Sequence, residues 1–424
     1  MKKIYKLIVI IFLIIFISFL FFKNYRTLTN SIPESIKKLI PTNIADIHFA
    51  IENFINLNVN KNFIYNVKFL PDTQLANDNG DVELVIHEVL LNKKEFEVKR
   101  FYIDLYKDNI FLITSRANIF HTKIKKINSD LKSIKPDKIN TNLDTYLESY
   151  KDIRVIDSFI NDNNIYISTY EHKSQFCNFR ILQAKINFSK LLFNEIFINP
   201  GCSEDNIQGG RIQKIKVDGN DGLLFSLAEN KTDTPNFKAQ DDLSFLGKII
   251  FLNIENKKTT IFSKGHRNPQ GLIVENNVIL STEHGPNGGD EINKIVKGKN
   301  YGWPIASYGK FYNNKFKNYL NNHYVNGFEE PLYAYVTAIG ISEIAKVPLE
   351  FFKIKNFNNI FFISSLRGRS LHLIKLDNDY NKVIFSEKIF INRKIRDLKY
   401  LKEKNLFLLA LEEPIRLGLF KLKK

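Results

Sequence analysis

The chain has 424 residues, of which 44% are hydrophobic, which is enough for one large packed domain or for two or three smaller ones. Its formal net charge of +16 is spread along the sequence among asparagines and isoleucines, with no arginine-rich block. This distribution argues against a nucleic-acid-binding protein and indicates a basic, solvated surface that is compatible with anionic lipid.

The amino terminus has the features of an export signal. Three lysines precede an uninterrupted apolar run, Leu7–Phe22, which Lys23 closes. A positive start followed by an apolar segment is typical of a signal sequence, and no small-residue cleavage site follows it. We therefore expect residues 1–25 to form an uncleaved transmembrane signal-anchor, with a cleaved signal peptide as the alternative. The positive residues would stay in the cytoplasm, so the rest of the chain would face the periplasm from a single-pass anchor in the inner membrane.

Residues 26–98 are expected to form a spacer followed by strands. Within them, residues 62–98 have the apolar and β-branched composition of strands. Such strands either close a ring beside the C-terminal strands or form a small appendage, and the sequence leaves both arrangements open.

One pattern recurs six times between residues 99 and 424. A short apolar strand is followed by a turn rich in Asn, Asp, Gly or Lys and by a second apolar strand, which predicts a β-hairpin. The six instances are residues 104–115, 157–169, 215–229, 271–284, 351–366 and 397–413. A repeat of this length suits a four-stranded blade, so the sequence predicts an all-β fold, a six-bladed β-propeller over residues 99–424.

The chain contains two cysteines, Cys177 and Cys202, at the ends of a segment that is predicted to form two strands around a turn. In an antiparallel hairpin these ends lie opposite each other, within reach of a disulfide in an oxidising compartment. Two unpaired, buried cysteines are the alternative that the sequence leaves open.

The segment 265–309 differs from the rest of the chain. It concentrates glycines, prolines and carboxylates with the only tryptophan, Trp303, and contains "GHRNPQGL", "EHGPNGGDEIN" and "NYGWP". Its second half, residues 285–309, begins the longest gap between predicted hairpins. A long, polar, glycine-bearing insertion in a regular array is typical of a functional loop.

These motifs resemble the glucose/sorbosone dehydrogenase family, soluble quinoprotein sugar dehydrogenases that use pyrroloquinoline quinone (PQQ) on a six-bladed propeller. The resemblance is strong over residues 247–309 and recognisable from about residue 104 to residue 376. It implies that Arg267 and Asn268 contact the cofactor and that His284 faces it. It also implies that Arg367 and Arg369 clamp the cofactor carboxylates, since a guanidinium binds a carboxylate bidentately.

The resemblance implies three further sites, one for the cofactor and two for calcium ions. Lys353 lies near a lysine that contacts the cofactor in the family. The carbonyl oxygens of Gly285 and Pro286 match those that hold a calcium ion, which accepts backbone carbonyls as readily as carboxylates. Glu291 and Tyr301 match a second, structural calcium site. The acidic pair Asp290 and Glu291 is also compatible with a charged turn that binds no metal.

One departure from the family concerns the catalytic base. The family's base is the histidine of an "H-x-G-G-R-L" motif, and the corresponding text "DNIQGGRI" has Ile207 at that place. Isoleucine cannot accept a proton, so the substitutes to consider are Glu204, Asp205 and His284.

Two hypotheses follow from the sequence. The first is a membrane-tethered, periplasmic, PQQ-dependent dehydrogenase that oxidises a sugar or polyol. The second is a catalytically degenerate propeller that binds a carbohydrate or a protein.

Overall fold

The computed structural model describes residues 63–68, 81–147, 152–173, 176–201, 209–229, 237–310, 322–352 and 358–423. The predicted signal-anchor, residues 1–25, and most of the predicted spacer lie outside these ranges. Within them, no helix has the length and apolar character needed to cross a membrane.

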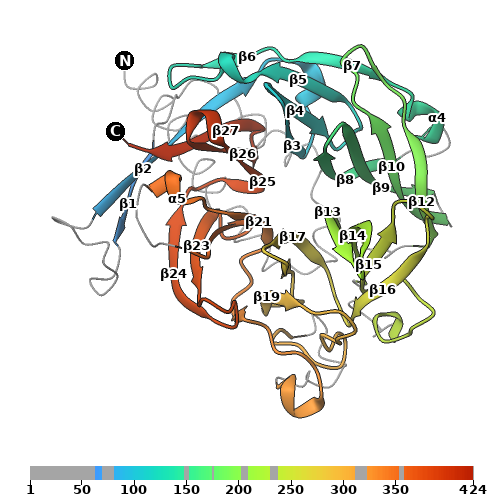
Figure 1. Ribbon diagram of the computed structural model, residues 1–424. Coiled ribbons are helices and arrows are strands. Elements are labelled where there is room, and N and C mark those ends of the chain that lie inside the picture. Colours follow the sequence, from blue (N-terminus) through green and yellow to red (C-terminus); the bar gives the residue numbers. More distant parts are fainter. Residues whose placement is uncertain are drawn as a thin grey trace, which may run out of the picture. The chain divides into compact units, whose positions relative to one another are not determined.

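Six β-sheets surround a central axis, which confirms the predicted six-bladed β-propeller (Figure 1). From the axis outward, the first three sheets are β3 (Phe101–Tyr106), β4 (Asn109–Thr114), β5 (Ile119–Lys123) and β7 (Asp137–Thr141); β8 (Asp152–Asn161), β9 (Asn164–Lys173), β10 (Phe176–Lys185) and β12 (Asn194–Pro200); and β13 (Gly209–Val217), β14 (Asn220–Leu227), β15 (Lys248–Asn253) and β16 (Thr259–Lys264). The next three are β17 (Pro269–Glu275), β18 (Val278–Glu283), β19 (Asp290–Ile295) and β20 (Tyr333–Tyr335); β21 (Ile341–Lys346), β22 (Ile360–Ser365), β23 (Ser370–Leu376) and β24 (Val383–Phe390); and β25 (Lys394–Leu401), β26 (Leu406–Glu412), β27 (Arg416–Leu422) and β2 (Asp81–Leu91).

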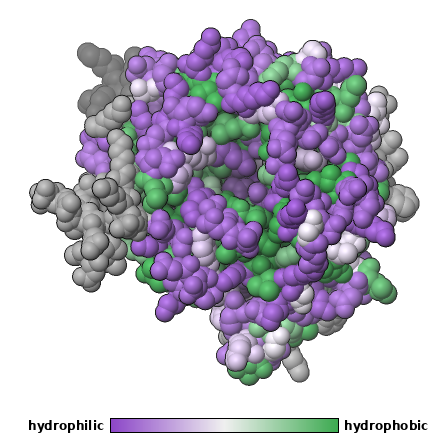
Figure 2. Space-filling view, in the orientation of Figure 1, coloured by the Kyte–Doolittle hydropathy of each residue, from purple (hydrophilic) through white to green (hydrophobic). Residues whose placement is uncertain are grey.

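Short elements decorate these blades. They are β1 (Phe63–Lys68), β6 (Ser133–Ile134), β11 (Lys190–Leu191), α4 (Leu143–Leu147), α5 (Leu349–Phe352), and the 3-10 helices η1 (Lys94–Phe96), η2 (Ile124–Lys126), η3 (Phe237–Ala239), η4 (Tyr324–Asn326) and η5 (Lys402–Lys404). Viewed along the axis, the propeller is hollowed at its centre, with hydrophilic residues inside the hollow (Figure 2).

Strand β2 closes the ring. It pairs antiparallel with β27, with Leu84 opposite Leu422, and so joins the first described strands to the last in one sheet. Alternate side chains of β2, Leu84 and Ile86, are fully buried in the core that also holds Phe420. Of the two arrangements that the sequence left open for residues 62–98, the structure has the ring-closing one.

The fifth predicted hairpin is wrong in its first strand. That strand is β21, whereas Phe351 and Phe352 form the helical turn α5. The Phe351 ring is buried and lies 5.0 Å, between centroids, from that of Phe407 in the neighbouring blade. A short apolar run is compatible with either a strand or a buried helical turn, and packing between blades selects the turn here.

The cysteine hairpin has the predicted antiparallel form. Strand β10 pairs with β12, with Asn178 opposite Pro200, and the Gly201 N–H donates to the Cys177 carbonyl at 2.7 Å. Cys177 is disulfide-bonded. Its predicted partner, Cys202, lies outside the described residues.

Five of the six inner strands carry a β-bulge. Their register with the second strand of the blade shifts between Val155 and Asp157, Gly209 and Ile212, Pro269 and Gly271, Ile341 and Ile344, and Ile395 and Asp397. A bulge re-aims the side chain of the extra residue. Four polar side chains that meet near the axis, those of Arg211, Gln270, Glu343 and Arg396, come from these bulges.

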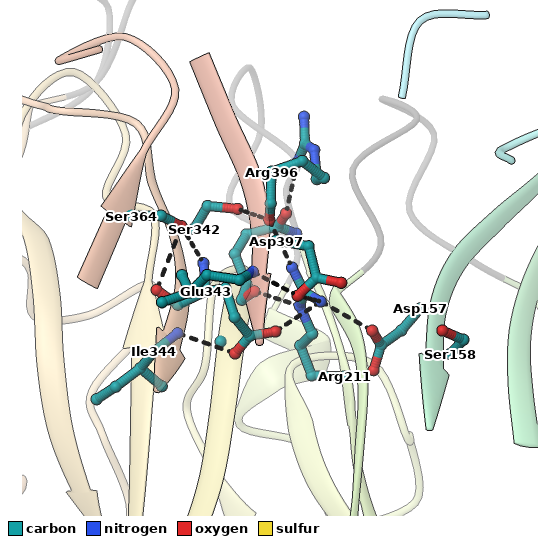
Figure 3. A network of polar contacts seen from close by, with 12 residues as sticks. Asp157, Ser158, Arg211, Ser342, Glu343, Ile344, Ser364, Arg396 and Asp397 are labelled. Atoms are coloured by element: carbon teal, nitrogen blue, oxygen red, sulfur yellow. Dashed lines mark hydrogen bonds and ion pairs between the residues drawn. The ribbon is translucent and has the colours of Figure 1, made fainter. Parts of the chain in front are cut away.

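Arg211 links the inner strands at the axis (Figure 3). Its guanidinium contacts a residue on each of the other five inner strands: Asp157 on β8 at 2.8 Å, the Gln270 carbonyl on β17 at 2.5 Å, Glu343 on β21 at 2.7 Å, the Arg396 carbonyl on β25 at 3.1 Å, and the ring of Tyr102 on β3 at 5.6 Å from its centroid. Arg211 is 2% exposed, so these contacts replace water completely. One side chain therefore fixes the blades relative to one another.

Two buried carboxyl groups on inner strands, those of Asp104 on β3 and Glu343 on β21, bind protons unusually tightly. Burial raises the pKa of Asp104 to about 7, and burial likewise raises the pKa of Glu343 to about 7. Their carboxyl groups keep protons in the folded state at pH values where an unfolded chain has lost them. The free energy of unfolding is therefore expected to fall as the pH rises from about 4 to about 7, by up to about 1.4 kcal/mol per pH unit for each group.

This pH dependence can be measured by urea unfolding between pH 5 and pH 8. The variant Asp104→Asn is expected to show a shallower fall than the wild type, because one of the two groups no longer titrates. The exposed Asp108, which pairs with Lys123, provides the matched control Asp108→Asn. Equal slopes in the wild type and in Asp104→Asn would contradict the interpretation.

Candidate functional site

The β17–β18 hairpin brings two of the predicted motifs together. Arg267 and Asn268 precede β17, His284 follows β18, and the strand ends pair with Pro269 opposite Glu283. The His284 N–H donates to the Asn268 carbonyl at 3.0 Å. Residues that the resemblance placed on one cofactor therefore lie at one end of one hairpin.

Glu283 holds this turn in place. One of its carboxylate oxygens accepts the backbone N–H groups of Arg267 and Asn268, and the other lies 3.0 Å from Nδ1 of His266. All four residues are buried. Glu283 immediately precedes the "HGP" text, but its role could not be predicted from the sequence because it depends on cross-strand register.

The Arg267 side chain folds back onto the loop that follows β18. One terminal nitrogen donates to the carbonyl oxygens of His284 at 2.9 Å and Gly285 at 2.7 Å, and the guanidinium lies 5.4 Å from the centroid of the Trp303 ring. Trp303 therefore takes part in the site as well as in packing. A calcium ion on the Gly285 carbonyl would share that oxygen with a guanidinium.

Two buried nitrogen atoms at this turn have no hydrogen-bond partner among the described residues. They are Nδ2 of Asn268 and Nε2 of His284. Burial lowers the pKa of His284, and the guanidinium of Arg267 adds to this effect, so the imidazole is neutral at neutral pH. A buried polar atom left unpaired costs about 1–3 kcal/mol. Two of them beside one arginine indicate a place for a polar ligand, to which the Asn268 amide can only donate.

A small pocket lies beside these groups, lined among others by Arg267, Glu283, His284, Glu291, Tyr301 and Trp303. Its wall is braced by Asp290, which accepts the N–H groups of Gly285 at 3.1 Å, Ile339 at 2.9 Å and Ile341 at 3.0 Å. Asp290 thus ties the Gly-Pro loop to the next blade.

Glu291 and Tyr301, the predicted second calcium site, both line this pocket. Burial raises the pKa of Glu291 well above its usual range, and the nearby Glu283 adds to the effect. The Tyr301 hydroxyl donates to the Lys294 carbonyl at 2.6 Å and accepts from the Val296 N–H at 2.9 Å, so it is engaged within its own blade. In the described part of the chain, no group of three or more His, Cys, Asp or Glu side chains is arranged to hold a metal ion.

Of the other predicted site residues, the structure describes only Arg367 and Arg369. Arg367 is exposed, and Arg369 donates to Asn392 at 3.4 Å. Lys353, Ile207, Glu204 and Asp205 lie outside the described residues. Instead, the buried Arg396 approaches the site: its charge contributes to lowering the pKa of His284, and it is bonded to Gln270. Arg396 could not be predicted as a site residue because it lies on β25, in another blade.

A profile of the glucose/sorbosone dehydrogenase family matches residues 100–417. The chain belongs to the glucose/sorbosone dehydrogenase family. It is 30% identical over 233 residues to an aldose sugar dehydrogenase of Escherichia coli, which covers 51% of this chain and 59% of the relative. It is 37% identical over 99 residues to quinoprotein glucose dehydrogenase B of Acinetobacter calcoaceticus, covering 20% of this chain and 21% of that protein. These matches span less than two thirds of either relative.

Solved structures of similar proteins share the propeller fold. The apo-form of the soluble aldose sugar dehydrogenase of E. coli aligns with a TM-score of 0.62 at 23% identity, over 80% of this chain and all of that one. The PQQ-bound form of an aldose sugar dehydrogenase from Streptomyces coelicolor aligns with a TM-score of 0.57 at 16% identity, over 80% and 98% of the two chains. Both support the six-bladed architecture.

Proposed function

We propose that this family member is a PQQ-dependent sugar dehydrogenase that residues 1–25 anchor in the inner membrane with the propeller in the periplasm. The observation that carries the proposal is the meeting of the Arg267 guanidinium with the unpaired nitrogens of Asn268 and His284 at one turn. PQQ has carboxylates and carbonyl oxygens, which can accept from the guanidinium and from Nδ2 of Asn268, while Nε2 of His284 is left to accept a proton. When bound, the quinone would accept a hydride from the alcohol carbon of a sugar.

The residues of this turn have separate roles in the proposal. Arg267 provides fixed positive charge, and Asn268 a neutral donor. His284, whose Nε2 has no partner in the described structure, takes the hydroxyl proton of the substrate in place of the histidine that Ile207 replaces. The alcohol thereby loses one hydride and one proton and becomes a carbonyl compound.

Calcium remains part of the proposal at Gly285 and Pro286, with a second ion at Glu291 and Tyr301. Since Arg267 already donates to the Gly285 carbonyl, calcium binding there requires the guanidinium to share or release that oxygen. Calcium is therefore tested as a separate component.

The test is reconstitution of the full-length chain, purified in mild detergent, with PQQ in the presence and absence of calcium. We expect quinone absorbance to stay with the protein through gel filtration and aldoses to reduce a dye. The variant Arg267→Leu should lose quinone retention by at least about 100-fold in Kd, since a desolvated charged contact of about 3 kcal/mol is removed. The exposed Lys297, which pairs with Asp218, supplies the control Lys297→Leu, which should bind as the wild type does.

Two other outcomes contradict the proposal in different ways. Quinone retention without dye reduction for any aldose would favour the catalytically degenerate propeller. Absence of both retention and thermal stabilisation by PQQ would exclude a quinoprotein.

A further inference from the structure

A chain of side-chain hydrogen bonds runs from the sixth blade to Asn268. Arg396 donates through Nε to Glu412 at 2.7 Å and through a terminal nitrogen to Oε1 of Gln270 at 3.3 Å. Nε2 of Gln270 then donates to Oδ1 of Asn268 at 3.0 Å. Glu412, Arg396, Gln270 and Asn268 are 6%, 6%, 8% and 0% exposed, so water cannot readily replace any of these bonds.

The chemistry of the two end groups sets the direction of this chain. A carboxylate only accepts and a guanidinium only donates. Because Arg396 can only donate, the amide of Gln270 must turn its oxygen toward Arg396 and its nitrogen toward Asn268. The Asn268 oxygen is consequently occupied, and its nitrogen, Nδ2, remains without a partner in the described structure.

The backbone of Gln270 is fixed as well as its side chain. Gln270 is the extra residue of the bulge between Pro269 and Gly271, and its carbonyl accepts Nε of Arg211 at 2.5 Å. Gln270 is thus held at two places, at its backbone carbonyl by Arg211 and at its side-chain amide by Arg396. Such support is what a precisely oriented binding group requires.

We propose that Gln270 is a positioning residue that fixes the polarity of the Asn268 amide, so that the site offers a buried N–H donor and the ligand must bring an acceptor oxygen to it. The acceptor is a carbonyl or carboxylate oxygen, and its identification with PQQ rests on the proposed function. The polarity itself does not rest on that identification.

The variant Gln270→Glu tests the proposal by reversing the polarity while keeping the shape. A carboxylate at this position accepts from Arg396 and also from Asn268, which must turn its nitrogen inward and its oxygen toward the ligand. We expect the Kd for PQQ to rise about 10- to 100-fold, the worth of a hydrogen bond lost and an oxygen–oxygen repulsion gained. The Tm should stay within a few degrees of the wild type, since Arg396 gains a charged partner.

The variant Gln270→Met is the matched comparison. It has a similar size but no polarity, so Asn268 is free to present either end and the Kd should rise only a few-fold. A merely structural role for Gln270 predicts the opposite order, with methionine, which breaks the chain, more harmful than glutamate. Finding methionine the weaker binder would overturn the proposal.

A second readout does not depend on PQQ. In protein labelled with 15N-asparagine, the side-chain NH2 signal of Asn268, assigned by its loss in Asn268→Asp, should move downfield in Gln270→Glu as the group bonds to a carboxylate. An unmoved signal would overturn the proposal whether or not PQQ binds. If the wild type retains no PQQ while the signal moves, the proposed function fails and the positioning role stands.

Discussion

Replacement of Arg211 by methionine is expected to lower the free energy of unfolding by about 3–5 kcal/mol at pH 8, where Glu343 has lost its proton, because it leaves buried carboxylates without their cation. The guanidinium is the partner of both Asp157 and Glu343, and it donates to two backbone carbonyls in other blades. Methionine fills a similar volume, so the loss would come from charge and hydrogen bonding and not from a cavity. Urea unfolding followed by circular dichroism measures the effect.

The neighbouring Lys214 on the same strand provides the control. Its ion pair with Asp162, at 3.4 Å, is between side chains that are 38% and 74% exposed, so Lys214→Met should change the free energy of unfolding by no more than about 0.5 kcal/mol. Arg211→Lys keeps the charge but has a single nitrogen, and it should fall between the two because lysine cannot reproduce the planar fork. Equal stability of Arg211→Met and Lys214→Met would show that the blades do not depend on this residue.

The repeated hairpins explain why the propeller could be predicted from sequence. Turn residues and apolar strands are local signals, and they recur in every blade. The closure of the ring could not be predicted in the same way, because Leu84 and Leu422 pair across almost the whole chain and alternation alone does not select a partner. The prediction of the fifth hairpin was wrong for a related reason, since packing of Phe351 against Phe407 in the neighbouring blade favours a helical turn over a strand.

The same distinction between local and long-range signals decides which residues of the site could be predicted. Arg267, Asn268 and His284 were predicted together because they flank one hairpin and belong to recognisable motifs. Two residues support them, Glu283 through cross-strand register and Arg396 through contact between blades. Neither relation can be recognised from the spacing of residues along the sequence. Bulges add to this difficulty, since each one reverses which side chains face the axis.

Removal of the Glu283 carboxylate by Glu283→Ala is expected to lower the free energy of unfolding by about 3 kcal/mol and to abolish PQQ retention. One of its oxygens accepts the N–H groups of Arg267 and Asn268 and the other lies against His266, all of them buried. Without it, the turn that carries the predicted cofactor contacts loses the acceptors for two backbone donors. Stability by urea unfolding and quinone retention by gel filtration report the two effects separately.

The conservative variant Glu283→Gln distinguishes this positioning role from a requirement for negative charge. Its amide oxygen can still accept both backbone N–H groups, and its nitrogen can donate to Nδ1 of His266 if the imidazole proton moves to Nε2, beside Ser263 at 2.8 Å. We therefore expect glutamine to restore most of the stability and most of the quinone binding. Glu275→Ala on the same hairpin, where the carboxylate pairs with Lys346 at 3.4 Å near the surface, should leave both properties unchanged. If glutamine proves as damaging as alanine, the site depends on the negative charge of Glu283 and not on its hydrogen-bond geometry. The role of Glu283 would then be to neutralise the positive charge of Arg267.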